Sequence, residues 1–301
     1  MDNHFTEIIP KNTVLKHYWL LNKKNGKYNF AFIGPSRVLN TLDMSVFERN
    51  LKVNPINLGL SGAGYAEQYL MFKTFIDENK NRINRLFIEI SYFNVIDPDS
   101  SFSYPFHEYY YFPYIKKEFV YNIIKDNSKN KLKAMAWRYI PLIRYAEFNV
   151  NFRPLILFTS TIEGKGGDSG FNKHGDMLVD KAMDANYEKG IYSNAEMNTK
   201  TINYLEEMVA FKRNKMEIIL FTSPTYDQGL SASKEALLNY RKVVSDITNK
   251  YGIKYYNFET ADMCSDKNYF ADRTQLNRRG AEVFSKVFCD SLISSDNLSG
   301  Q

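Results

Sequence analysis

The sequence predicts an α/β protein, a three-layer sandwich built on a five-stranded, parallel, flavodoxin-like sheet. The first observation is that apolar runs of strand length alternate with amphipathic segments of helix length along most of the chain. The second is that these runs are almost continuously apolar, which is typical of strands buried on both faces. The third is the composition: 44% of the residues are hydrophobic and 24% are charged, as in ordinary packed domains.

Five segments are expected to form the strands. Each is rich in apolar residues and runs into a glycine or a polar residue: 28–33, 56–58, 86–90, 217–222 and 253–258. Between them, large apolar side chains recur at helical spacing, which predicts the crossover helices: 38–50, 66–79, 196–212, 234–250 and 279–293. Parallel strands need such crossovers, so residues 1–301 are expected to form a single domain.

The segment 98–193 interrupts this alternation. It is aromatic and irregular, and it contains one expected helix pair, near 116–125 and 132–145. We interpret it as a helical and aromatic cap insertion over the C-terminal ends of the strands. Open α/β sheets bind their ligands at that edge, so the insertion is expected to border the site.

Charge and hydropathy exclude several classes of partner. Lys and Arg number 39 and Asp and Glu 34, a net charge of +5, and no basic arm stands out that would gather this excess, so no nucleic-acid partner is expected. No apolar run approaches the roughly 18 residues of a membrane helix, so stable membrane insertion is not expected. Without a recognisable export signal, we expect a cytoplasmic protein; the alternative is an exported one whose anchor is absent from this sequence.

No cofactor and no metal ion are expected. The glycine-rich segments lack the spacing of nucleotide-binding loops. Cys264 and Cys289 lack the spacing of metal ligands and are expected to be buried or surface thiols, with a disulfide as the alternative.

Residues suited to catalysis follow the expected strands. Ser36 comes after the first strand, Gly59 after the second and Asn94 after the third, and Asp272 and Gln275 lie in the last loop. Because the C-terminal ends of parallel strands meet at one edge of a sheet, we expect these residues to lie close together. Ser36 would stand at the start of a helix, where backbone N–H groups favour negative charge.

Four blocks, in this order, resemble the SGNH (GDSL-type) hydrolase superfamily. They are Gly34-Pro35-Ser36 after the first strand, Gly59 after the second, Asn94 after the third, and the late stretch from Asp272 through Gln275 to Gly280-Ala281. The Ser36-Arg37 pair and the long insertion are similar to the branch of esterases and acyltransferases that acts on acyl groups of cell-surface polysaccharides.

That resemblance implies serine acyl chemistry. Ser36 would be the nucleophile, and Asp272 would orient the base. The backbone N–H groups of Ser36 and Gly59 and the side-chain amide of Asn94 would form the oxyanion hole, with Ser91 as the alternative to Asn94 in the alignment. Donors of this kind are each typically worth about 3–4 kcal/mol in the transition state.

Gln275 departs from the family pattern, because it stands where the family has its general-base histidine. A glutamine amide can hydrogen-bond Ser36 but cannot take its proton. Three explanations stay open: a catalytically silent member that still binds its ligand, a base supplied from the insertion by His107 or His174, or a glutamine engineered to trap a complex.

Substrate contacts are expected from Arg37, His107 and Tyr110. Tyr110 lies in the aromatic run 104–114, whose flat rings suit stacking on sugars; the alternatives are packing of the cap on the sheet or a homodimer contact. Arg37 suits an anionic or polar substrate group, and the alternative is a structural ion pair at the start of the helix.

Two functions follow from these residues. The first is a serine esterase or O-acetyltransferase acting on acyl esters of cell-surface polysaccharide, with catalysis impaired by Gln275. The second is a catalytically silent carbohydrate-binding or assembly protein of polysaccharide biosynthesis. In both, the partner is a carbohydrate or an acylated polysaccharide.

Overall fold

The structure is a computed structural model that describes most of the chain. The residues described are 16–21, 27–78, 83–96, 107–128, 130–144, 146, 171–184, 190–192, 196–211, 216–227 and 230–299.

The sheet has five parallel strands, as the sequence predicts, in the order β2-β1-β3-β5-β7. These strands are β1 (Phe30–Ile33), β2 (Pro55–Asn57), β3 (Arg85–Glu89), β5 (Glu217–Thr222) and β7 (Lys254–Asn257). This is the flavodoxin-like order, in which the direction of winding reverses between β1 and β3. A doubly wound sheet binds its ligand in the crevice at that switch point.

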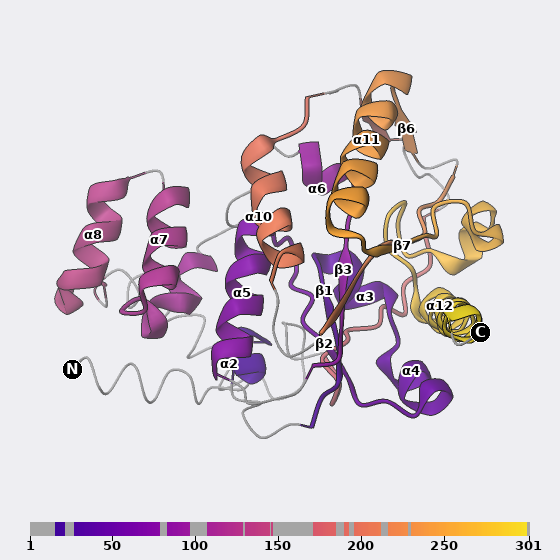
Figure 1. The fold of residues 1–301 in the computed structure, drawn as a ribbon, viewed down its shortest axis with the longest axis horizontal. Coiled ribbons are helices and arrows are strands. Elements are labelled where there is room, and N and C mark those ends of the chain that lie inside the picture. The colour runs from indigo at the N-terminus through magenta and orange to yellow at the C-terminus, as the bar shows by residue number, and fades with distance from the viewer. Residues whose placement is uncertain are drawn as a thin grey trace.

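Helices cover both faces of the sheet (Figure 1). Ala31 and Ile33 of β1 point into one core, and Phe30 and Phe32 point into the other, as the two-residue period of a strand requires. The first core is covered by α2 (Lys16–Leu21), α5 (Tyr65–Glu78), α10 (Thr199–Val209) and α11 (Lys234–Tyr251). The second is covered by α3 (Ser36–Thr41), α4 (Met44–Leu51) and α12 (Arg278–Ser299).

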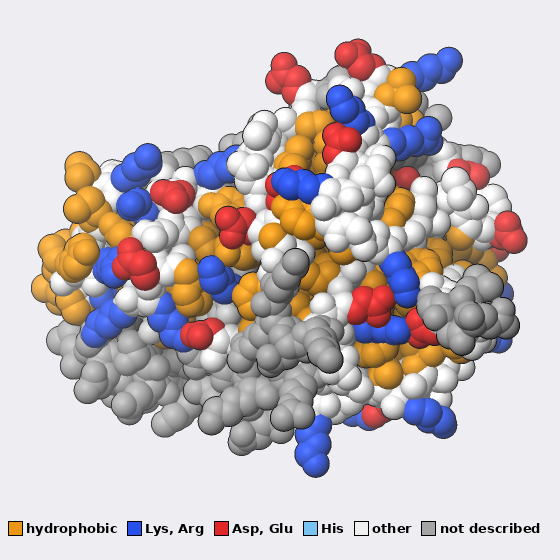
Figure 2. All heavy atoms as spheres, viewed as in Figure 1, with side chains coloured by type: hydrophobic (Ala, Val, Ile, Leu, Met, Phe, Trp, Pro, Cys, Tyr) orange, Lys and Arg blue, Asp and Glu red, His pale blue; other side chains and the backbone are white. Residues whose placement is uncertain are grey.

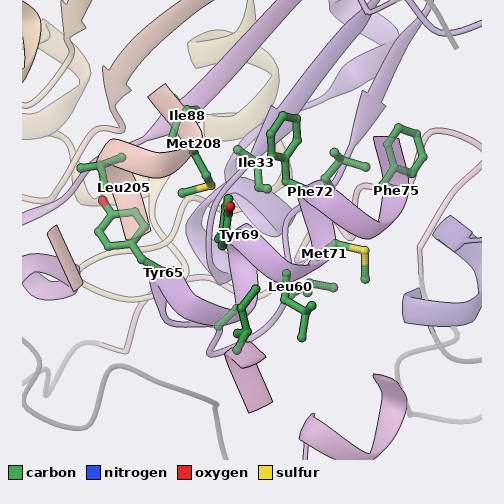
Figure 3. Packing of buried hydrophobic residues seen from close by; sticks show 14 of the residues in the cluster. Ile33, Leu60, Tyr65, Tyr69, Met71, Phe72, Phe75, Ile88, Leu205 and Met208 are labelled. Carbon is green, nitrogen blue, oxygen red and sulfur yellow. The ribbon is translucent and has the colours of Figure 1, made fainter. Parts of the chain in front are cut away.

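The helix α5 is the centre of the first core. Figure 3 shows Tyr69 and Phe72 of this helix close to the strand residues Ile33 and Ile88, with Leu205 of α10 nearby. All of these side chains are at least nine-tenths buried. The packing holds β1 and β3 in place, and these are the two strands that border the switch point.

The second core is built around one aromatic ring. Phe288 of α12 is fully buried and has ring contacts at centroid distances of 4.8 Å to Phe258 and 5.1 Å to Phe221. Further rings surround it at somewhat longer distances: Phe32, Phe47, Phe87, Tyr256 and Phe284. This cluster attaches the last helix of the chain to the strands.

Capping residues define where several helices begin and end. Asp43 caps α4 by accepting from the Ser45 N–H at 2.9 Å, and Ser233 caps α11 by accepting from the Ala236 N–H at 3.1 Å. At the other end of α11, Gly252 takes the left-handed conformation (φ 62°) that commonly terminates helices.

Residues 107–144 of the segment 98–193 lie beside α5 and include the expected helix pair, whereas residues 171–184 run along β2, α3 and the start of α12. The first of these parts contains the 3-10 helix η2 (His107–Tyr114), α7 (Glu118–Asn127) and α8 (Lys131–Tyr139). The helix α7 packs on α5, and α7 and α8 stand at one end of the molecule (Figure 1). Later in the segment, β4 (Gly190–Tyr192) pairs with β6 (Leu230–Ala232) in a separate two-stranded sheet.

The remaining short elements lie near the strand ends. They are α6 (Tyr92–Ile96), η4 (Asp262–Ser265) and η5 (Lys267–Tyr269). Cys264 and Cys289 are buried free thiols. Among the described residues, no helix combines the length and the apolar character needed to span a bilayer.

Candidate functional site

An open pocket of about 330 Å³ lies at the switch point of the sheet. Its walls come from the turn after β1, the loop after β2, the helix after β3 and the last loop: Pro35, Ser36, Arg37, Gly62, Ala63, Gly64, Phe93, Asn94, Arg273 and Thr274. The structure brings Ser36, Asn94 and the 272–275 loop together at this edge of the sheet. None of these wall residues belongs to the described part of the 98–193 segment.

Ser36 is the first residue of α3 and follows a very tight turn. A Cβ on Gly34 would overlap Val38 and would lie 2.9 Å from the Cβ of Glu89, so a side chain at residue 34 would push α3 away from β3. The carbonyl of Pro35 accepts from the Val38 and Leu39 N–H groups, so the chain enters the helix at once. The hydroxyl of Ser36 therefore lies at the C-terminal end of β1.

Gln275 contacts Ser36 directly. Its Nε2 donates a hydrogen bond to Ser36 Oγ at 3.3 Å, and its Oε1 accepts one from Asn40 Nδ2 at 2.8 Å. Asn40 lies one turn after Ser36 on α3 and is buried. In this arrangement the amide nitrogen of Gln275 faces the serine and its oxygen faces Asn40. Ser36 therefore receives a proton donor where a serine hydrolase needs a proton acceptor.

Asp272 shapes the loop rather than reaching the serine. Its Oδ1 accepts hydrogen bonds from the Thr274 N–H at 2.7 Å, the Thr274 hydroxyl at 3.0 Å and the Gln275 N–H at 2.9 Å. The loop is closed by a bridge between Phe270 and Leu276. Asp272 thus sets the backbone that carries Gln275, and this differs from the side-chain contact by which a triad aspartate orients its histidine.

Gly59 is packed tightly, and its N–H has a partner inside the protein. It donates to Asn57 Oδ1 at 2.8 Å, and a Cβ on Gly59 would lie 2.6 Å from the Leu39 nitrogen. The carbonyl of Gly59 accepts from the buried Lys16 side chain. A role in the oxyanion hole would require the bond to Asn57 to open.

The later glycines of the same turn line the pocket. Gly62 and Gly64 stand in its wall, and Gly62 has a φ of 67°, a conformation that glycine adopts without strain. Sequence reasoning chose the first glycine after the strand and missed these two. The signal that could have found them is the density of glycine in residues 59–64.

Asn94 lines the pocket and carries a side-chain donor that has no partner among the described residues. It lies on α6, where its backbone N–H donates to the Ser91 carbonyl at 3.2 Å. Its Nδ2 is buried and has no hydrogen-bond partner among the described residues. A buried amide without a partner is costly, so a ligand atom or a water molecule is expected to accept from it. Ser91, the alternative in the alignment, is fully buried and is not part of the pocket wall.

Arg37 forms a buried ion pair under the pocket. Its Nε lies 3.2 Å from Glu89 Oε1, and its Nη2 donates to the carbonyls of Ser223 at 2.5 Å and Pro224 at 3.3 Å. Burial raises the pKa of Glu89 to about 7, although the charge of Arg37 acts in the opposite direction. The guanidinium connects α3 to the ends of β3 and β5, while part of the residue still lines the pocket.

The other predicted residues lie elsewhere or outside the described atoms. The ring of Tyr110 packs on His17 at a centroid distance of 4.3 Å and is buried in the first core. His17 Nε2 lies 3.0 Å from Glu67, and the two ring nitrogens of His174 contact Pro55 O and Glu48 Oε2 at 3.2 and 3.1 Å. His107 begins η2, and its side chain is outside the described atoms.

Among the described residues, no group of three or more His, Cys, Asp and Glu side chains is arranged to hold a metal ion. The polar side chains of the pocket wall are the hydroxyls of Ser36 and Thr274, the amide of Asn94 and the guanidinium groups of Arg37 and Arg273.

Comparison with known proteins gives only distant likenesses. No protein-family model and no curated protein sequence matches the chain. A Streptococcus pneumoniae protein described as a candidate platelet activating factor is similar in structure, with a TM-score of 0.41 and 13% identity over 92% of this chain and 89% of its own. A gut microbial diltiazem-metabolizing enzyme is similar with a TM-score of 0.41 and 11% identity, over 89% of this chain and 47% of its own.

Proposed function

We propose that the pocket at Ser36 binds acyl esters of carbohydrate hydroxyls in the manner of a serine esterase, and that Gln275 leaves turnover slow or absent. The observation that carries this proposal is the pair of hydrogen bonds made by Gln275, to Ser36 Oγ at 3.3 Å and from Asn40 at 2.8 Å. The cell-surface polysaccharide as the source of the ester rests on the resemblance of the Ser36-Arg37 pair and the long insertion to that branch of the superfamily.

Acyl transfer to a serine requires a base at the hydroxyl. As the serine oxygen attacks the carbonyl carbon, its proton must leave, and an amide nitrogen that already donates to that oxygen cannot accept it. Loss of the base from a serine triad typically costs about 10⁶-fold in turnover. Hydrogen-bond donors around the carbonyl oxygen, together with substrate binding, can still give roughly 10³–10⁴-fold acceleration over water without the base. We therefore expect the protein to bind its ligand even where turnover is nearly lost.

An active esterase or O-acetyltransferase is the second candidate. The buried, unpartnered Nδ2 of Asn94 in the pocket wall favours it, because a fixed donor beside Ser36 suits the developing oxyanion. In such an enzyme, water or a sugar hydroxyl would resolve the same acyl-serine intermediate.

Two measurements on the full chain separate these candidates. The first is hydrolysis of p-nitrophenyl acetate by the wild type and by Ser36→Ala, with Ser294→Ala as the matched control because that serine lies on the exposed side of α12. The second is calorimetric binding of O-acetylated xylo-oligosaccharides and of the same oligosaccharides after deacetylation.

The proposal expects equal, slow hydrolysis by all three proteins and tighter binding of the acetylated ligand, with that preference reduced in Ser36→Ala. Hydrolysis that falls at least about 100-fold in Ser36→Ala alone would establish the active enzyme instead, since general-base catalysis contributes that much. Equal binding of the two oligosaccharides would reject a site for acyl esters.

A further inference from the structure

The helix α8 has apolar side chains on two opposite faces. Ala134 and Trp137 point inward and are at least 98% buried. Leu132, Met135 and Tyr139 recur at spacings of three and four residues on the other side and are 76%, 44% and 67% exposed. A helix that packs on a globular protein needs only one apolar face, so the second face is expected to have a partner.

The exposed apolar surface continues past the end of α8. Ile140, Leu142 and Ile143 are 46%, 67% and 38% exposed. Nine large hydrophobic side chains are exposed among the described residues, and six of them lie within 132–143. We call these six the apolar patch. Figure 2 shows hydrophobic side chains gathered at the end of the molecule where α7 and α8 lie, with Lys and Arg side chains beside them.

The net charge of the protein is concentrated in the same segment. Residues 107–146 contain eight Lys and Arg and three Asp and Glu, a net charge of +5. The whole chain also carries +5, so the rest of the sequence is balanced. The excess is thus carried by folded helices of this segment and does not form a separate basic arm. Between Asp126 and Glu147 the sequence has no acidic residue at all.

Part of this charge supports the structure, and part of it faces the solvent. Arg144 is fully buried and donates to the carbonyl of Trp137, and Arg138 pairs with Glu118 at 2.6 Å. Lys116 and Lys131 are exposed, and Lys131 immediately precedes the first residue of the apolar patch. Lysine side chains at the rim of an apolar surface can reach outward while their stems cover its edge.

We propose that the apolar patch and its surrounding lysines bind the surface of an anionic lipid bilayer. Apolar side chains that enter the headgroup boundary, bordered by Lys and Arg that contact anionic lipids, are the features of an interfacial helix. A second copy of the chain suits this surface less well, because it would bring a segment of charge +5 against an identical one. The attachment is peripheral, since none of the described helices can span a bilayer.

Attachment at this surface would orient the molecule. The patch is at the α7–α8 end, and α5 lies between that end and the sheet (Figure 1). The protein would therefore be held by one end while the sheet, with the Ser36 pocket at its edge, projects from the membrane. This inference does not depend on the chemistry at Ser36.

The test is co-sedimentation of the full chain with large unilamellar vesicles, made either of phosphatidylcholine alone or of phosphatidylcholine mixed with phosphatidylglycerol. We expect binding to the mixed vesicles, weakened by added salt because the attraction is screened. Leu132→Gln with Leu142→Gln is expected to weaken binding by about tenfold per leucine. Leu238→Gln, which replaces a leucine 63% exposed on α11, is the matched control and is expected to leave binding unchanged.

A second variant, Lys131→Glu, changes an exposed charge without touching the core and keeps the test decisive if the leucine variant unfolds. It is expected to lower binding to the mixed vesicles several-fold. Failure of the folded wild type to bind mixed vesicles, or equal binding by the wild type and both variants, would overturn the proposal. A wild-type dimer that the leucine variant dissociates, seen by light scattering in the absence of vesicle binding, would replace it with self-association.

Discussion

Gln275→His offers the sharpest test of the proposed site. The replacement places an imidazole where the glutamine amide now contacts Ser36 at 3.3 Å. A neutral imidazole can accept the serine proton, and general-base catalysis typically contributes 10²–10⁴-fold. If Ser36 and the amide of Asn94 are already arranged for acyl transfer, this single change should create measurable esterase activity.

The geometry places the expected gain at the low end of that range. The Oδ1 of Asp272 already accepts three hydrogen bonds from Thr274 and Gln275, so only its Oδ2 is left to orient the new ring. An imidazole without its aspartate loses much of its effect, because the ring is not held in the productive tautomer. We therefore expect kcat/KM for p-nitrophenyl acetate to rise about 100-fold, which corresponds to about 2.7 kcal/mol in the transition state.

Two controls define the result. Gln275→Leu removes the same hydrogen bond without supplying a base and should show no gain. Ser36→Ala combined with Gln275→His should abolish the gain. The new activity should also rise with pH through about 6.5, where a histidine loses its proton. A gain that survives the loss of Ser36, or a histidine variant no faster than the leucine variant, would refute the geometric argument.

Three further predictions concern the scaffold. Burial raises the pKa of Glu89 from its ordinary 4.5 to about 7, so between these pH values the folded state keeps a proton that the unfolded state releases. The free energy of unfolding should therefore fall by about 3 kcal/mol as the pH rises from 4.5 to 7. Glu89→Gln should remove this pH dependence of the unfolding free energy, measured by urea titration. Phe288→Ala should lower the free energy of unfolding by about 4 kcal/mol, because it empties the centre of the aromatic cluster. A Cβ on Gly280 would overlap the Tyr269 carbonyl, so Gly280→Ala should destabilise the protein by about 1–3 kcal/mol.

Each of these predictions has a matched comparison. Asp176 is another buried carboxyl group, and burial raises its pKa as well. Asp176→Asn should leave the pH dependence that comes from Glu89 in place. Val287→Ala, at a half-exposed neighbour of Phe288, should cost far less. Arg279→Ala, next to Gly280 but exposed, should be nearly neutral. A steeper pH dependence after Glu89→Gln, or costs in the controls that equal those in the test variants, would contradict the reasoning.

The sheet could be predicted from the sequence because its signal is local. Continuous apolar runs mark strands buried on both faces, and the run 217–222 coincides with β5 as observed. The other four strands lie within two residues of their predicted bounds. The pairing of β4 with β6 was not predicted, since strands of three residues carry almost no periodic signal.

The sequence could predict which residues of the site lie near one another, but not the hydrogen bonds between them. The topology brings Ser36 and Gln275 together, and this follows from their positions after strands of one parallel sheet. The hydrogen bonds decide what each residue can do, and the sequence does not reveal them. The side-chain oxygen of Gln275 accepts from Asn40, and its nitrogen donates to Ser36. The Asn57-x-Gly59 spacing is typical of an Asx-turn, and this signal could have warned that the Gly59 N–H has a local acceptor.

Ser36 and Gln275, which form a hydrogen bond at the pocket, are 239 positions apart in the chain. A protein is synthesised from its N-terminus, and early segments begin to fold while later ones are still being made. The turn that presents Ser36 can form early, whereas the loop that carries Gln275 is made only after all five strands of the sheet. The pocket is therefore completed only after the whole sheet has been made. A molecule that binds there would stabilise chains that contain this loop, while leaving shorter nascent or truncated chains unaffected.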